Sequence, residues 1–252
     1  MAISKRFLIF ILVILALSLI SIYYPKLTGN ATSTQVNYER ETAILNRVVD
    51  GDTIEVTGSE IGNKIHIRLL GINTPEKNMP HANDGKEFLQ QFVNKTIYLE
   101  RDREDLDKYK RKLRYLYFQD RLINLEIVEK GFANAYMTDG LKYTHAFLRA
   151  ESQAREFAVG IWQKSNEVCA SCILLDSIDT ANDKFILENQ CNFDCNLSNW
   201  FVKDAGRNIL YLSSLESNSQ EVFQSKSGVW TDSGDELFLF DKEGKLVLYY
   251  NY

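Results

Sequence analysis

The chain has 252 residues, of which 45% are hydrophobic and 25% charged, and its formal net charge is −5. The length allows one or two domains, and the composition is ordinary for globular protein, which argues against a disordered or fibrous chain. The acidic balance argues against a protein that binds nucleic acid through its overall charge. Basic residues are clustered, however, with seven Lys or Arg against four Asp or Glu in residues 101–114. Such a run is more often a solvated surface than a binding site.

The amino-terminal segment determines the predicted compartment. Lys5 and Arg6 precede an apolar run of eighteen residues, Phe7 to Tyr24, which is interrupted only by two serines. A helix of this length spans roughly 27 Å, close to the ~30 Å hydrocarbon core of a bilayer. No clean cleavage site follows, so we expect residues 1–24 to form an uncleaved transmembrane signal-anchor, with all later residues outside the cytoplasm. Removal of this segment as a signal peptide is the alternative and would give a secreted protein.

Residues 25–41 are polar and show no periodicity, and we expect them to form a flexible linker. Short strands follow. Val48 to Val56 reads as a hairpin around the Asp-Gly-Asp turn at residues 50–52. Residues 63–70 alternate apolar and polar side chains, which places Arg68 on the face opposite the packed side. Further strands are predicted at residues 97–100 and 113–118.

Three helices are predicted among these strands. Asp84 and Glu87 resemble a capping box that opens a helix continuing to Val93. A second helix is predicted over residues 122–130, with Gly131 at its carboxyl end. A third runs from Phe147 to Ala158 and ends at a Gly-Ile-Trp sequence. Together the five strands and three helices predict an α+β barrel domain at residues 42–165.

Residues 166–252 have a different character. No helical pattern is present, a strand is predicted at residues 209–212, and a hairpin is predicted from strands at 237–240 and 245–250. Short strands separated by turns are typical of a β-sandwich, so we expect a second domain of this kind.

The four cysteines lie at the start of this second domain and allow two interpretations. Their spacing, Cys-x2-Cys and Cys-x3-Cys separated by eighteen residues, fits a tetrahedral Zn²⁺ site. Two disulfides are equally natural outside the cytoplasm, and the predicted compartment favours them slightly. Either role would be structural for these residues: Cys169, Cys172, Cys191 and Cys195.

Acidic and basic residues combine in the first domain in a way that suggests chemistry. The Asp-Gly-Asp turn is followed by a run from Arg68 to Glu76, and Arg111 lies in the basic segment. Acidic groups can hold a hard cation and arginines can bind a phosphate, a combination suited to phosphodiester cleavage. Each feature alone is weak evidence, because surface turns often contain such residues.

In this combination, residues 42–165 resemble the staphylococcal nuclease (thermonuclease) family. The matching segments are VDGDT at 49–53, IRLLGINTPE at 67–76, DKYKR at 107–111, GFA at 131–133 and GIW at 160–162. The resemblance implies an OB-fold five-stranded β-barrel with three helices. It also implies a Ca²⁺-dependent phosphodiesterase that cleaves DNA and RNA and leaves 3′-phosphates.

The resemblance further implies a role for individual residues. Asp52 would be a direct Ca²⁺ ligand and Thr74 would contribute its backbone carbonyl. The family's second metal carboxylate falls on Asn73, whose amide oxygen can ligate Ca²⁺ without adding negative charge, so we expect weakened but surviving Ca²⁺ use.

Catalytic and substrate-binding roles are implied in the same way. Glu76 would position or deprotonate the attacking water, and Arg68 and Arg111 would hold the phosphate and neutralise charge in the transition state. Nucleotide contacts are implied for Lys108, Tyr109 and Tyr136.

From about residue 169 to 252, the chain more loosely resembles a lamin-tail domain, through segments at 182–189, 197–204 and 227–239. This resemblance implies an immunoglobulin-like β-sandwich that binds DNA, the cell envelope or another protein. The whole chain is therefore predicted to be a membrane-anchored, extracytoplasmic Ca²⁺-dependent endonuclease. The alternative is a catalytically weakened or inactive nucleic-acid-binding surface protein.

Overall fold

The computed structural model describes residues 40–138, 140–206, 208–226, 228–231 and 234–252. The predicted transmembrane segment and all but the last two residues of the predicted linker lie outside this range. Among the described residues, no helix is both long enough and apolar enough to cross a membrane.

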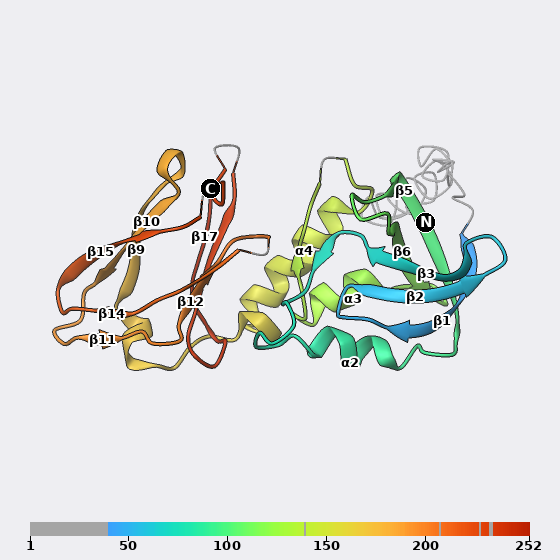
Figure 1. Cartoon of the computed structure of the whole chain (residues 1–252). Coiled ribbons are helices and arrows are strands. Elements are labelled where there is room, and N and C mark those ends of the chain that lie inside the picture. The colour runs from blue at the N-terminus through green and yellow to red at the C-terminus, as the bar shows by residue number, and fades with distance from the viewer. Residues whose placement is uncertain (1–39, 139, 207, 227, 232–233) are drawn as a thin grey trace, which may run out of the picture. The chain divides into compact units, whose positions relative to one another are not determined.

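The first half of the described chain is a closed β-barrel (Figure 1). Its strands follow the order β3-β2-β1-β5-β6-β7, and a parallel pairing of β3 with β6 closes the sheet. Closure leaves five strands around the barrel, with β7 as a short extension, which confirms the predicted five-stranded architecture. The strands are β1 (Glu41–Val48), β2 (Thr53–Gly58), β3 (Gly62–Leu69), β5 (Thr96–Leu106), β6 (Lys112–Phe118) and β7 (Arg121–Leu122).

The period of two along β3 directs one face of the strand into the barrel. Ile67 and Leu69 are fully buried, whereas Arg68 between them is only partly buried on the opposite face. The core behind them is built from aliphatic and aromatic side chains of all five strands and the helices. Burial of the neighbours therefore fixes the direction in which Arg68 points.

Three helices accompany the barrel, as predicted, and their bounds are α2 (Asp84–Gln90), α3 (Ile123–Glu129) and α4 (Thr144–Glu156). The predicted capping box is wrong. The residue that caps α2 is Asn83, which makes no side-chain cap hydrogen bond. Asp84 is already helical, and its carboxylate lies 2.8 Å from Nδ1 of His81 instead. The helix also ends at Gln90, three residues earlier than expected.

A tight turn at Gly71 brings two parts of the candidate site together. It links β3 to the short strand β4 (Ile72–Asn73), which pairs with β8 (Asn134–Ala135). Gly71 has a φ of +77°, and a Cβ there would lie 2.8 Å from the Phe147 ring. Only glycine satisfies both the backbone angle and the close approach. The reversal leaves Arg68 and Asn73 on the wall of one cavity.

Two β-sheets form the second half. One has the order β15-β10-β9 and the other the order β13-β12-β16-β17. Phe185 and Leu187 of the first sheet share one buried core with Leu237 and Leu239 of the second, an arrangement that agrees with the predicted β-sandwich. The strands are β9 (Ile173–Asp179), β10 (Lys184–Asn189), β12 (Phe201–Lys203), β13 (Ile209–Tyr211), β15 (Ser219–Gln224), β16 (Glu236–Phe240) and β17 (Leu246–Asn251).

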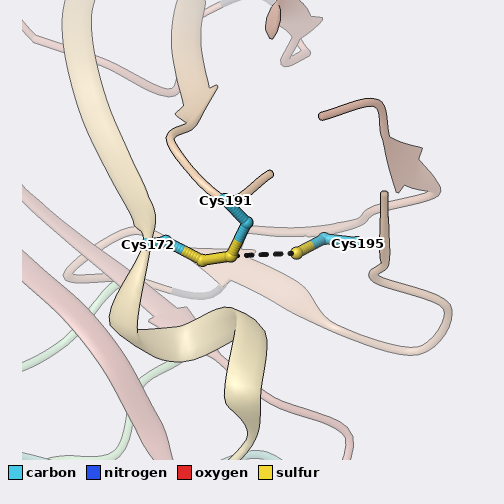
Figure 2. Close-up of side chains that lie close together, drawn as sticks. All are labelled: Cys172, Cys191 and Cys195. Carbon is cyan, nitrogen blue, oxygen red and sulfur yellow. Dashed lines mark hydrogen bonds between the residues drawn. A yellow bond between two sulfur atoms is a disulfide. The ribbon is translucent and has the colours of Figure 1, made fainter. Parts of the chain in front are cut away.

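The four cysteines form two disulfides beside the short pair β11 (Cys195–Asn196) and β14 (Ser214–Leu215). Cys169 pairs with Cys195, and Cys172 pairs with Cys191, with Cα atoms 5.8 Å and 5.4 Å apart. Figure 2 shows the Cys172–Cys191 bond with the Cys195 sulfur beside it. A zinc site needs free thiolates, so the structure favours the disulfide interpretation over zinc.

A hydrophobic core joins the two halves. Its centre is the fully buried Trp162, which lies in the 3₁₀ turn η1 (Gly160–Trp162) after α4. The Trp162 ring lies 5.6 Å from the Phe238 ring and 5.5 Å from the Tyr249 ring. The other buried members are Ala154, Ile161, Phe201, Phe240 and Leu246. Apolar burial of this kind holds the sandwich against α4.

One buried and one partly buried carboxylate lie near this core. Glu151 of α4 is 3% exposed, and its Oε1 accepts a hydrogen bond of 2.7 Å from the backbone N–H of Ala135. Glu236 of β16 accepts a hydrogen bond of 2.6 Å from the Tyr249 hydroxyl. Burial, and next the charge of Glu236, raise the pKa of Glu151 to about 7, against the opposing effects of the Ala135 hydrogen bond and of the Arg155 charge.

Glu151→Gln is expected to stabilise the fold at pH 8 by about 3 kcal/mol. The folded-state pKa of Glu151 is raised from 4.5 to about 7, so unfolding releases a proton between these values and the wild type loses stability as the pH rises. Glutamine keeps an acceptor for Ala135 and never ionises. The free energy of unfolding should therefore diverge from that of wild type above pH 4.5 and level off above pH 7. Urea titrations at several pH values measure this difference, and Glu156→Gln, at an exposed position of the same helix, is the control. If the difference in unfolding free energy between Glu151→Gln and wild type did not depend on pH, this prediction would be contradicted.

Candidate active site

The candidate site is centred on Asp52, which is 4% exposed and lies in the turn between β1 and β2. Its Oδ2 lies 3.1 Å from Nη2 of Arg68 and accepts two longer contacts of 3.4 Å from the N–H and hydroxyl of Thr74. The Asp52 N–H donates to Oδ1 of Asp50 at 3.1 Å. One buried carboxylate thus connects the β1–β2 turn, strand β3 and the segment after β4.

The second arginine reaches the same carboxylate through Thr53. The Thr53 hydroxyl donates to Oδ1 of Asp52 at 3.0 Å, and its oxygen lies 3.3 Å from Nη1 of Arg111, which donates to it. Arg68 also donates to the Leu69 carbonyl at 2.6 Å, which holds its guanidinium in place. The structure therefore places Arg68 directly at one oxygen of Asp52 and connects Arg111 to the other oxygen through the Thr53 hydroxyl.

Asp107 is a site residue that the sequence interpretation missed. Its Oδ1 accepts hydrogen bonds of 2.9 Å from the backbone N–H groups of Tyr109 and Arg111, and its Oδ2 accepts one of 2.7 Å from Nε of Arg111. Burial opposes ionisation, but the Arg111 hydrogen bonds outweigh it and lower the pKa of Asp107. Asp107 thus orients Arg111. An Asp four residues before the Arg, in a turn, is the signal that could have identified it.

Thr74 contacts Asp52 directly, Asn73 precedes Thr74 in the chain, and both residues are buried. The packing is close, because a Cβ at Gly51 would lie 2.8 Å from the Thr74 side chain. The Asn73 amide is engaged with the second half of the chain: Nδ2 donates to the carbonyls of Ala205 and Gly206 at 3.1 Å and 3.2 Å. No local pattern could reveal a contact between residues so distant in sequence.

Glu76 occupies a different place from the two arginines. It lines a small hollow together with Lys203 and Phe238 of the sandwich. Burial lowers the pKa of Lys203, while the charges of Asp204, Glu236 and Glu76 act in the opposite direction. Glu76 therefore lies where the barrel meets the sandwich, in a setting that the sequence did not predict.

A cavity of about 850 Å³ is lined by Arg68, Arg111 and Asn73. The three residues predicted to contact nucleotides line it too: Lys108, Tyr109 and Tyr136. Tyr109 is 62% exposed, with the Lys108 ammonium 5.2 Å and the Arg111 guanidinium 5.5 Å from its ring centre. Positive groups beside exposed aromatic rings suit a substrate with phosphates and stacking bases.

The donor atoms around Asp52 are suited to a hard cation. Asp50, Asp52, Asn73 and Thr74 carry carboxylate, carbonyl and amide oxygens, and these are the ligand types that Ca²⁺ prefers. Burial, followed by the charge of Asp52, raises the pKa of Asp50. A divalent cation would relieve this crowding of negative charge.

Comparison with known proteins gives a consistent result. The family model described as "Staphylococcal nuclease homologue" matches residues 66–164. A thermonuclease from Staphylococcus intermedius is 27% identical over 161 residues, which cover 60% of this chain and 95% of that protein. An uncharacterized endonuclease from Haemophilus influenzae is 34% identical over 134 residues, or 52% of this chain and 71% of that protein. The endonuclease YncB of Bacillus subtilis is 33% identical, covering 49% and 63% respectively.

Proposed function

The chain belongs to the staphylococcal nuclease family, and on this premise we propose that it is a Ca²⁺-dependent endonuclease. Its substrates would be DNA and RNA, and its products would carry 3′-phosphate ends. The observation that carries the proposal is the pair of arginines on the wall of one cavity with basic and aromatic residues. Arg68 is paired with the buried Asp52, and Arg111 is linked to Asp52 through Thr53.

Asp52, the Thr74 carbonyl and the Asn73 amide oxygen would hold the cation. When bound, Ca²⁺ supplies positive charge to a phosphoryl oxygen and helps to orient the attacking water. Asn73 contributes no charge where the family has a carboxylate, so the site should need a higher Ca²⁺ concentration than its relatives.

Arg68 and Arg111 would bind the scissile phosphate. Guanidinium groups present several donors in a planar fork, so they match a phosphate and stabilise the charge that develops on its oxygens. Asp107 keeps Arg111 directed into the cavity through the 2.7 Å contact with Nε. Glu76 would position the attacking water and take its proton, and Lys108, Tyr109 and Tyr136 would hold the neighbouring nucleotides.

We propose an extracytoplasmic location, with residues 1–24 as the membrane anchor or, if they are cleaved, as a secretion signal. The two disulfides support this location, because such bonds persist mainly outside the reducing cytosol. For residues 166–252, fourteen acidic against six basic residues disfavour DNA as the partner of the sandwich and favour the cell envelope or another protein. Its relation to lamin-tail domains remains part of this proposal.

The amide at position 73 favours a second candidate function, a surface protein that binds nucleic acid with little or no cleavage. Arg68→Met separates the two. If the chain is a nuclease, this change should lower kcat about 100-fold, because one preorganised charge donor is lost. Turnover of a fluorescent oligonucleotide with Ca²⁺ measures this. The control is Arg47→Met, which removes a surface arginine whose side chain is 57% exposed and paired with Glu55. Equal behaviour of the two variants would contradict the enzymatic role.

A further inference from the structure

The sandwich reaches the candidate active site through one loop, which connects β12 to β13. The backbone carbonyls of Ala205 and Gly206 in this loop accept both hydrogen bonds of the Asn73 amide nitrogen, at 3.1 Å and 3.2 Å. Gly206 also lines the cavity that contains Arg68 and Arg111. A backbone segment of the second domain therefore forms part of the wall around the candidate active site.

Hydrogen bonds hold the described residues of this loop: Asp204, Ala205 and Asn208. Asp204 is buried, and its Oδ1 accepts a 2.9 Å hydrogen bond from the Asn208 N–H, while its Oδ2 accepts one of 2.6 Å from the Asn208 amide. The Ala205 N–H donates to Oδ1 of Asp235 at 3.3 Å. Lys203, at the start of the loop, donates to the Asp204 carbonyl at 2.8 Å. The carbonyls that face Asn73 are thus held in fixed positions by the sandwich itself.

The chemistry of this contact requires a donor at position 73. A carboxylate of the same size would place an oxygen about 3 Å from two carbonyl oxygens, with no proton to share. The two hydrogen bonds would become repulsive contacts between partly negative atoms in a buried setting. An amide therefore suits this position for a reason separate from cation affinity. The nuclease family's carboxylate is incompatible with the loop as it is placed here.

We propose that the sandwich is a built-in wall of the active site, and that Asn73 holds this wall in place. The two bonds from Nδ2 to the loop fix the orientation of the Asn73 amide. Its Oδ1, the only atom of this side chain that can ligate a cation, takes no part in that contact. The hydrophobic core around Trp162 supports the same placement through Phe201 of β12 and Phe238 of β16. The role of Asn73 in holding the loop stands on these contacts alone, whereas its Oδ1 role rests on the proposed nuclease function.

Asn73→Asp in the full chain tests the proposal without Ca²⁺ or substrate. Hydrogen–deuterium exchange is measured at the backbone amides of Ala205 and Asn208, both of which are hydrogen-bonded within or next to the loop. We expect exchange about tenfold faster or more than in wild type, because loss of the two bonds and the added repulsion favour local opening. Asn73→Ala removes the donor without adding charge and should give a smaller acceleration. If Asn73→Asp does not fold, the exchange rates of Asn73→Ala alone test the proposal.

The matched control is Asn196→Asp. It makes the same chemical change at an asparagine whose side chain accepts hydrogen bonds, whereas the Asn73 side chain donates them. Asn196 uses only Oδ1, as the acceptor for the N–H of Ser198 at 3.0 Å and its hydroxyl at 2.6 Å, so a carboxylate keeps both bonds. Its exchange at Ala205 and Asn208 should equal that of wild type. Wild-type exchange in both Asn73 variants would overturn the proposal. Faster exchange in Asn73→Asp, together with a wild-type chain that cleaves no DNA, would instead contradict the nuclease function and leave the role of Asn73 intact.

Discussion

Glu76→Gln is expected to lower the rate constant for DNA cleavage by about 100-fold to 10,000-fold, the usual contribution of a general base. Glutamine has nearly the same size but cannot accept the proton of the attacking water. Single-turnover cleavage of an oligonucleotide at saturating Ca²⁺ measures the chemical step directly. DNA binding should change by less than about threefold, because the substituted group acts on the water and not on the phosphate.

Glu60→Gln is the control for this prediction, since Glu60 is an exposed residue of the β2–β3 turn. Glu76 and Lys203 of the sandwich line the same hollow, so the alternative role for Glu76 is to stabilise the contact between the two halves. If Glu76 served only the contact between the halves, the glutamine variant would unfold at a lower temperature and retain its cleavage rate. That outcome would exclude Glu76 as the base.

Trp162→Ala is expected to reduce the free energy of unfolding by about 3–5 kcal/mol, as is typical for truncation of a fully buried tryptophan. Its side chain is 0% exposed and contacts the rings of Phe238 and Tyr249. The Arg155 guanidinium lies over the same ring at 5.4 Å. The indole thus fills the space between α4 and the four-stranded sheet, and no neighbour can replace its volume without moving the two halves.

Guanidinium titrations followed by circular dichroism measure the loss in the Trp162 variant. Phe157→Ala removes another aromatic side chain near the end of α4, but Phe157 is 72% exposed, so its loss should cost less than about 1 kcal/mol. A similarly small effect at Trp162 would mean that the sandwich is not packed on the barrel as described.

Local patterns predicted the barrel and its helices. Alternation with a period of two identified β3 and the outward direction of Arg68, and the spacing of apolar residues identified α3 and α4. The predicted capping box failed because a short-range match in sequence does not exclude another partner. The Asp84 carboxylate contacts the His81 ring instead of capping α2.

Local sequence patterns could not predict the contacts between distant parts of the chain. Nothing near Asn73 in the sequence indicates that Ala205 will face it, because the docking of two domains determines that contact. The cysteine spacing was likewise compatible with a zinc site or with several disulfide pairings. Only the fold brings Cys169 to Cys195. The resemblance implied roles for the candidate site residues. The contacts of Thr53 and Asp107, which belong to the same motifs, needed the three-dimensional arrangement.

The central claim is that this chain cleaves nucleic acid with Ca²⁺ at the site around Asp52. The most direct test is cleavage of single-stranded DNA by the full chain, with Ca²⁺ varied from micromolar to tens of millimolar and a chelator as the control. We predict cleavage that starts only at high Ca²⁺, stops on chelation, and leaves 3′-phosphate ends. Absence of cleavage at every Ca²⁺ concentration, with DNA still bound, would contradict the claim and indicate a nucleic-acid-binding protein.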